Sequence, residues 1–210
     1  MFKTYGVVGI VLIVLMEINF FTKIEPFASW YFPIIWLGYI LTLDALVFKL
    51  RGTSLISNQF STFIGIVVIS ALFWWIFEFV NISLSNWTYQ GTAGLGSAKN
   101  FFGTLSFATV LPAFFETVER IRSIHLFDRK KLKKKHHVTK WLLHVMMVLG
   151  MICFIAPLFL PAFTFPLVWL SFFFFLDPIN YIHKQPSIIQ HLKDRKLVIP
   201  FSLLLAGIIM

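Results

Sequence analysis

Charged residues are scarce in this chain, and acidic residues are the scarcest of them. Of 210 residues 13% are charged, only nine are Asp or Glu, and 58% are hydrophobic. Soluble domains are about 45–50% apolar and about 25% charged. This composition excludes an ordinary soluble domain and predicts a polytopic membrane protein. No internal stretch is long and polar enough to be a soluble domain, so residues 1–210 are expected to form a single transmembrane domain.

Cysteine and the common catalytic motifs are nearly missing as well. The one cysteine, Cys153, excludes a disulfide within the chain. There is no GxxxxGK[ST] phosphate loop, HExxH, CxxC or GxSxG, so the usual sequence evidence for nucleotide, zinc-protease or serine-hydrolase chemistry is lacking. The adjacent His136 and His137 do not have the i,i+4 spacing that directs two side chains at one metal. No motif implies a cofactor or a metal.

Long hydrophobic runs are what the sequence has instead. A membrane-spanning helix needs about 20 mostly apolar residues. Seven runs qualify, at about 5–22, 29–48, 62–82, 101–119, 141–160, 164–182 and 197–210. The prediction is an all-α fold, a polytopic transmembrane helical bundle of about seven spans, in which the first run is a retained anchor.

The basic residues alternate along the chain in step with these seven runs. Sixteen of the 18 Lys and Arg residues fall on one side if the spans alternate, and only Lys23 and Lys99 fall on the other. The positive-inside rule then places the N-terminus in the cytoplasm of a cell whose inner (plasma) membrane holds the protein. The basic 120–140 loop is expected to contact anionic lipid headgroups, and no nucleic acid.

Two segments of the chain resemble each other. Residues 32–56, "FPIIWLGYILTLDALVFKLRGTSLI", and residues 165–189, "FPLVWLSFFFFLDPINYIHKQPSII", are identical at eight of 25 positions without a gap. Both segments are predicted to run from outside to inside, which indicates a parallel internal repeat of spans 2–3 and 6–7. Repeat one covers about 29–100 and repeat two about 164–210. The second copy ends before a counterpart of "WWIFEFVN", so the chain is expected to be truncated at its C-terminal end.

The repeat aligns two aspartates, Asp44 and Asp177, each about one turn before the cytoplasmic end of its helix. A carboxylate at a helix C-terminus opposes the helix dipole, so each Asp needs a cationic or hydrogen-bonding partner. The nearby candidates are Lys49, Arg51, His183 and Lys184. The alternative is that each Asp merely reaches the membrane interface and fixes a helix end.

A polar stripe runs along the third span. It comprises Ser70, Trp74, Glu78, Asn81 and Ser85, spaced by three or four residues. Glu78 has no basic neighbour in sequence, so it is the leading functional candidate, as a general acid or as a ligand of a coupling ion. The alternative is a structural hydrogen bond across helices. Trp74 and Asn81 complete the predicted catalytic group, while Trp75 is expected to face lipid.

Glu116 lies on a second stripe, in the fourth span. Four residues later comes Arg120, and the order Glu then Arg favours a local ion pair. Pro112 removes a backbone hydrogen bond just before Glu116, which is compatible with a kink and a cavity. We expect Asp44, Asp177, Glu116 and Ser70 to line a polar cavity between spans two, three, four and six.

At "FPIIWLGYILTLDALVF", "FWWIFEFVN" and "NWTY" the chain resembles an uncharacterised family of bacterial polytopic membrane proteins with duplicated FPxxWLxxxxxLD and Trp/Glu motifs. The resemblance implies a fold and no activity. A fainter similarity, to the heterodimeric-type lycopene cyclases, implies that Glu78 protonates a polyene while Trp74 and Trp75 stabilise the carbocation.

Three functions remain open from the sequence. The first is a small-molecule or ion transporter-like protein with an intramembrane carboxylate and aromatic face. The second is a membrane-embedded enzyme acting on a lipid or isoprenoid. The third is a structural or assembly subunit of a membrane complex.

Overall fold

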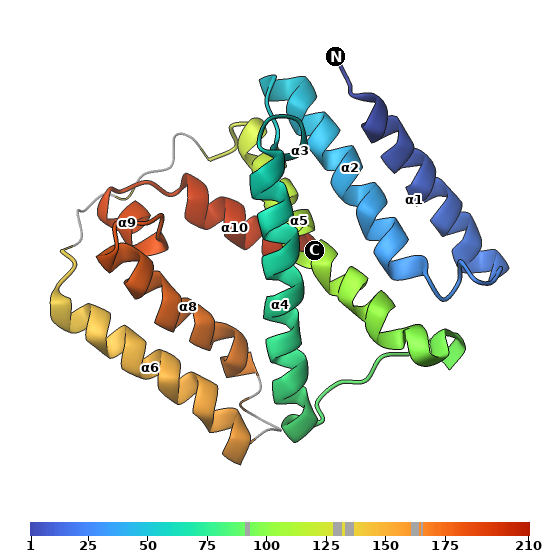
Figure 1. Ribbon diagram of the computed structural model, residues 1–210. Helices are drawn as coiled ribbons and strands as arrows, with labels where there is room; N and C mark the ends of the chain where they lie inside the picture. The colour runs from blue at the N-terminus through green and yellow to red at the C-terminus, as the bar shows by residue number, and fades with distance from the viewer. Residues whose placement is uncertain (91–92, 128–131, 133–136, 161–163, 165) are drawn as a thin grey trace. The chain divides into compact units, whose positions relative to one another are not determined.

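A computed structural model of the protein describes residues 1–90, 93–127, 132, 137–160, 164 and 166–210. Within these residues the structure is built from helices (Figure 1), as predicted. They are α1 (Thr4–Thr22), α2 (Tyr31–Arg51), α3 (Leu55–Asn58), α4 (Phe60–Leu84), η1 (Ala93–Ala98), α5 (Lys99–Ser123), α6 (Lys140–Phe159), α8 (Pro166–Ile182), α9 (Ile188–Lys193) and α10 (Val198–Ile209).

Five of these helices are long and apolar enough to cross a membrane: α1, α2, α4, α5 and α6. The other two predicted spans correspond to the shorter apolar helices α8, of 17 residues, and α10, of 12 residues. At 1.5 Å per residue, α10 is about 18 Å long, well short of the roughly 30 Å of a hydrocarbon core. The chain is therefore a multi-span membrane protein by helix length and composition, with five long spans where seven were predicted.

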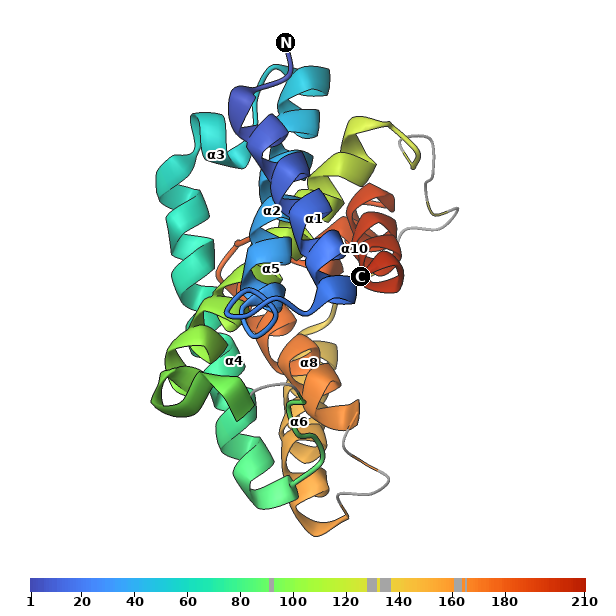
Figure 2. The same cartoon turned by 90° about the vertical axis from the view of Figure 1, so that its right-hand side faces the viewer.

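The described chain divides into two compact units, and the first comprises residues 1–79, 89–126 and 205–210. In it α2 packs along α1 and along α5 (Figures 1 and 2). The α1–α2 contact is close because glycines face each other. A Cβ on Gly9 would lie 2.6 Å from the carbonyl oxygen of Gly38, and one on Gly38 would lie 2.8 Å from that of Gly9. Small residues at such crossings allow helices in membranes to approach each other closely.

Helix α4 is tied to α5 by Ser70. Its hydroxyl donates to the carbonyl oxygen of Phe107 and accepts from the backbone N–H of Leu111 at 3.0 Å. Phe107 and Leu111 are four residues apart on α5, so Ser70 bonds both backbone groups of one helical turn. That turn directly precedes Pro112, which lies inside α5.

The second unit comprises residues 80–88 and 127–204. Here α6 packs along α8, and Gly150 marks their closest approach. A Cβ on Gly150 would lie 2.9 Å from the backbone nitrogen of Phe175 and 3.0 Å from the carbonyl oxygen of Ser171. Both units therefore contain a helix pair that depends on glycine.

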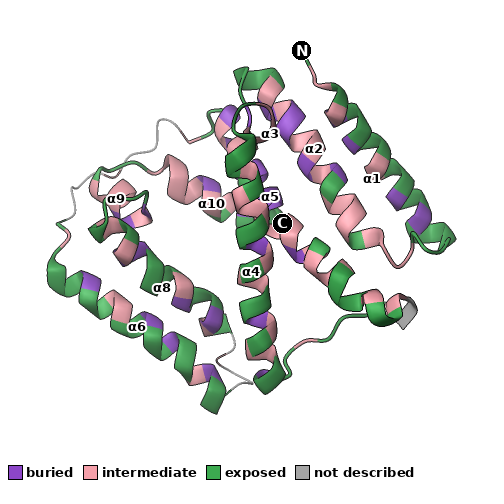
Figure 3. Cartoon of the chain, in the orientation of Figure 1, coloured by how far each residue is buried: buried purple, intermediate pink, exposed green. Residues whose placement is uncertain are grey.

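The long helices expose much of their apolar surface (Figure 3). On α1, for example, Val7, Val11 and Ile18 are about half exposed, whereas Gly6 and Gly9 are buried against α2. Apolar faces of this extent are unfavourable in water and suit the hydrocarbon of a bilayer. This pattern supports embedding of the helices in lipid.

Candidate functional site

A cavity of about 530 Å³ lies in the first unit, against α4, α5 and the start of α2. Ligand pockets in proteins commonly measure about 300–1,000 Å³. Its lining includes Glu78, Tyr89, Trp74, Trp75 and, at the start of α5, Lys99. Seven of the 18 lining residues are aromatic, one is an acid and one is a base.

Glu78 is part of a hydrogen-bonded chain across this wall. The hydroxyl group of Tyr89 donates to Glu78 Oε1, and the indole Nε1 of Trp74 donates to the Tyr89 oxygen at 3.4 Å. The sequence pointed to Glu78 and Trp74 but not to Tyr89, which follows α4 in the loop. Tyr89 belongs to the motif "NWTY", but nothing in the sequence indicates that it bonds Glu78.

The indole rings surround one phenylalanine of α5. The ring centroids of Trp74 and Trp75 lie 5.9 and 5.5 Å from that of Phe107, and that of Tyr89 lies 6.1 Å away. Trp75 also donates from Nε1 to Thr104 Oγ1 at 3.1 Å. Trp75 was expected to face lipid; its side chain is 39% exposed, and it also bonds α5 and contributes to the cavity wall.

Asn81, the third predicted catalytic residue, holds the turn after α4. Its Oδ1 accepts from the backbone nitrogens of Asn86 and Trp87 at 2.9 and 3.3 Å, and its Nδ2 donates to the Trp87 carbonyl oxygen at 3.0 Å. Both ends of the amide are therefore engaged with the backbone. A chemical role for Asn81 gains no support from this geometry.

Asp44 is fully buried at the end of α2 and bonds the segment that follows. Its Oδ2 accepts from the hydroxyl groups of Tyr5 and, at 2.8 Å, Ser54, while Oδ1 accepts from the backbone nitrogen of Ile56 at 2.8 Å. The basic candidate Arg51 instead pairs with Glu119. Asp44 thus finds its donors in two hydroxyl groups and the first turn of α3.

Asp177 occupies the equivalent place in the second unit and is almost fully buried. Its Oδ1 and Oδ2 accept from the backbone nitrogens of Ile188 and Ile189 at 2.7 and 3.0 Å. These nitrogens open α9, whose N-cap residue Ser187 accepts from Gln190 at 3.0 Å. Both aspartates are buried, and each stabilises the N-terminus of the next short helix.

Glu116 is the least satisfied acid in the described part of the chain. It is 0% exposed, and neither carboxyl oxygen has a hydrogen-bond donor among the described residues. The predicted pair with Arg120 is not formed, because Arg120 donates to Ser123 Oγ at 3.4 Å. The ion pairs of this helix end belong instead to Glu119, with Arg51 and Arg122.

The four residues predicted to line a polar cavity make different contacts in the structure. Asp44 and Glu116 are buried on α2 and α5 of the first unit, and Ser70 is engaged with the backbone of α5. Asp177 belongs to the second unit, where it bonds the start of α9. Glu78 and Trp74 line the aromatic cavity.

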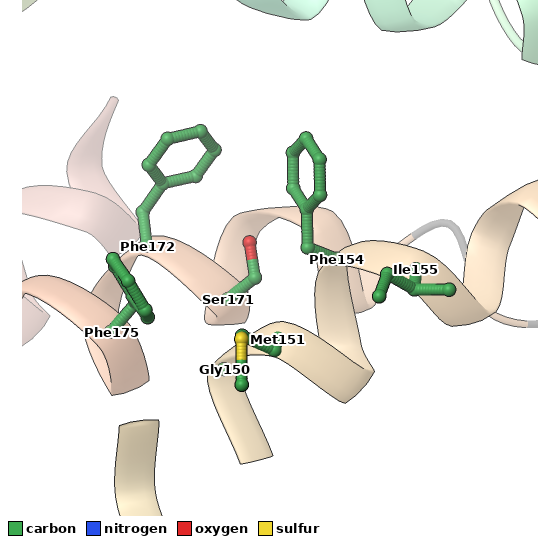
Figure 4. A pocket seen from close by; sticks show the side chains of 7 residues that line it. All are labelled: Gly150, Met151, Phe154, Ile155, Ser171, Phe172 and Phe175. Atoms are coloured by element: carbon green, nitrogen blue, oxygen red, sulfur yellow. The ribbon is translucent and has the colours of Figure 1, made fainter. Parts of the chain in front are cut away.

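A second hollow, of about 210 Å³, lies between α6 and α8 (Figure 4). Figure 4 shows Ser171 between the rings of Phe154 and Phe172, with Gly150 and Met151 on the neighbouring helix. The Ser171 hydroxyl donates to the carbonyl oxygen of Val168 at 2.6 Å. With its hydroxyl so engaged and its other walls apolar, this hollow offers no acid or base for chemistry.

In the part of the chain that the structure describes, no group of three His, Cys, Asp or Glu residues could hold a metal ion. Most of the basic run in the 120–140 loop, including His136, lies outside the described residues. Its predicted contact with anionic headgroups stays a prediction.

No protein-family model, curated protein or solved structure matches this chain. The geometry of the first unit therefore carries the functional argument.

Proposed function

We propose that this chain is a transporter-like membrane protein whose aromatic cavity binds a small organic cation with an apolar body. The observation that carries the proposal is the position of Glu78 in a cavity walled by Trp74 and Trp75. A carboxylate attracts a positive charge, and the faces of indole rings stabilise ammonium groups through cation–π contact. The surrounding apolar wall would take up the rest of the ligand.

Tyr89 supports this role for Glu78. Its hydroxyl group donates a hydrogen bond to the carboxyl group of Glu78. The Trp74 indole in turn donates to Tyr89, so the three polar groups are held in one orientation. A ligand then meets a preorganised acid instead of a mobile side chain.

The experiment is a binding titration followed by a flux measurement. Purified protein in lipid nanodiscs is titrated with benzyltrimethylammonium, and tryptophan fluorescence is recorded. Glu78→Gln should weaken binding about ten- to hundredfold, as expected for losing about 1.5–3 kcal/mol of interaction with a charged group. Uptake of the same cation into proteoliposomes should fall in parallel.

The matched control is Asp194→Asn, which removes an exposed acid of the second unit. It should leave both binding and uptake unchanged. Equal affinity in wild type and Glu78→Gln would contradict the proposal, as would uptake by Glu78→Gln at the wild-type rate.

A second candidate function rests on the same acid beside the same rings. A protonated Glu78 could add its proton to a terminal double bond of an acyclic isoprenoid, and the indoles of Trp74 and Trp75 would stabilise the carbocation. Attack by a neighbouring double bond would close a ring, and loss of a proton to the carboxylate would restore the acid. The product is an isomer of the substrate, so no co-reactant is needed.

This enzyme hypothesis has a distinct readout. Membranes containing the protein are incubated with an acyclic polyene. The products are separated by chromatography, and their masses are determined by mass spectrometry. A new compound of unchanged mass that is missing with Glu78→Gln would favour catalysis. Recovery of the unchanged polyene together with binding of the ammonium probe would favour transport.

A further inference from the structure

The second acidic position of the first unit lies between α1, α2 and α5 and does not depend on the aromatic cavity. Glu116 of α5 and Asp44 of α2 are both 0% exposed. Contacts between α2 and α5 lie close to both acids: Tyr39 bonds Thr117 at 2.8 Å, and Arg51 pairs with Glu119. Two carboxyl groups thus share one buried environment in the first unit.

The two carboxyl groups differ in their donors. Asp44 accepts from Tyr5, Ser54 and the backbone nitrogen of Ile56. An ionised carboxylate offers about four acceptor positions, so three are used and one remains. Glu116 has no donor among the described residues. Asp44 therefore has the hydrogen-bond donors that stabilise a carboxylate, whereas Glu116 has none among the described residues.

Among the residues that the structure describes, no base pairs with Glu116. Arg51 of α2 and Arg122 of α5 pair with Glu119, and Arg120 donates to Ser123. Lys3, just before α1, lies 4.0 Å from the centroid of the Phe48 ring. On the same two helices, Tyr39 and Thr117 bond each other at 2.8 Å, and the Thr117 hydroxyl group lies 3.6 Å from the sulfur of Met210.

A buried carboxylate without a donor or a counter-charge is strongly unfavourable, so such a group binds a proton instead. The protonated group then gains one O–H donor, which needs an acceptor. The free acceptor position of Asp44 supplies it. Two carboxylates alone are both acceptors and repel each other, whereas one proton between them turns the contact into a hydrogen bond.

We infer that Glu116 and Asp44 form a proton-binding site that holds one proton between two carboxyl groups. Glu116 carries the proton and donates it in a hydrogen bond to a carboxylate oxygen of Asp44. When the proton leaves, two buried negative charges remain on α2 and α5.

The test is infrared spectroscopy of the whole chain in lipid nanodiscs at neutral pH. A protonated carboxyl group has a C=O stretch that ionised carboxylates lack. Wild type should show this band, and it should shift when glutamate is replaced by ¹³C-labelled glutamate, which assigns it to Glu and not Asp. The band should persist in Glu78→Gln and disappear in Glu116→Gln, which mimics the protonated acid.

Two further variants test the partner. Asp44→Asn removes the charged acceptor and should shift the band, whereas Asp177→Asn, in the other unit, should leave it in place. A wild-type spectrum without a protonated-carboxyl band would overturn the inference without any substitution. A band that survives in Glu116→Gln would overturn it too. Neither result bears on ammonium binding at Glu78, so the two proposals can fail separately.

Discussion

Asp44 and Asp177 perform the same structural task in the two units. Each lies near the end of a long apolar helix and accepts a backbone N–H from the short helix that follows, at Ile56 and Ile189 respectively. These two isoleucines are aligned positions of the sequence repeat. In both units the bonded isoleucine thus lies twelve residues after the aspartate.

The difference between the two sites lies in what else the carboxylate meets. Asp177 takes a second backbone N–H, from Ile188, and both of its oxygens serve α9. Asp44 takes the hydroxyl groups of Tyr5 and Ser54 and faces Glu116. The N-terminus of α9 alone satisfies Asp177. Asp44 bonds Tyr5 of α1 as well as the start of α3, and Glu116 of α5 is its acidic neighbour. Capping of a short helix is common to both units, and the pair of acids is found in the first unit.

The largest expected effect comes from removing the acid that has more partners. Asp44→Ala leaves two hydroxyl groups, a backbone N–H and Glu116 without their partner, and should cost about 3–5 kcal/mol of stability. Thermal unfolding in detergent, followed by circular dichroism, measures it. Asp194→Ala, at an exposed acid, should change stability by less than about 0.5 kcal/mol. Equal loss in the two variants would refute the special role of Asp44.

The glycine contacts test whether both units rely on close helix packing. Gly9→Ala and Gly150→Ala place a Cβ within 2.6 and 2.9 Å of backbone atoms of the partner helix. Overpacking of this kind costs about 1–3 kcal/mol. Unfolding in detergent should show a loss in both variants. Gly65→Ala, where nothing lies within 4 Å of the new Cβ, is the control and should be neutral or stabilising.

Removing the simpler acid should have a smaller effect than removing Asp44. Asp177→Ala deletes an acceptor for two nitrogens of α9, and losing a helix cap costs about 0.5–2 kcal/mol. Amide hydrogen exchange should rise at Ile188 and Ile189 in particular. A loss as large as that of Asp44→Ala would erase the distinction between the sites.

The two N-cap serines give the smallest and finest comparison. Ser187→Ala removes one cap bond, to Gln190, and should cost about 1 kcal/mol. Ser54→Ala removes a longer cap bond, of 3.4 Å to Ser57, and also the donor to Asp44. Ser54→Ala should therefore be the more destabilising of the pair in the same unfolding assay. The reverse order would mean that Ser54 does not stabilise Asp44.

Hydropathy predicted the helical membrane fold because a long apolar segment in lipid must satisfy its backbone hydrogen bonds internally, as a helix does. The apolar runs 164–182 and 197–210 correspond to the shorter helices α8 (Pro166–Ile182) and α10 (Val198–Ile209). Helical spacing also brought Glu78 and Trp74 to one face correctly. Spacing along one helix, however, says nothing of partners on another.

That limit explains the errors at the acids. Proximity in the sequence predicted an ion pair between Glu116 and Arg120, and it offered Lys49 and Arg51 as partners of Asp44. The actual neighbours come from elsewhere in the chain: Tyr5 lies 39 residues before Asp44, and Asp44 itself lies beside Glu116 of α5. Only the tertiary contact of α1, α2 and α5 brings these groups together.

Helix α5 carries Phe107 in the aromatic cavity and, further along, Glu116 in the acid pair. Ser70 bonds α4 to α5 at Phe107 and Leu111, in the turn that begins at the cavity wall. A displacement of this turn would therefore also displace α4, which carries Trp74 and Glu78. The two helices thus form one common support for the aromatic and acidic sides of the cavity.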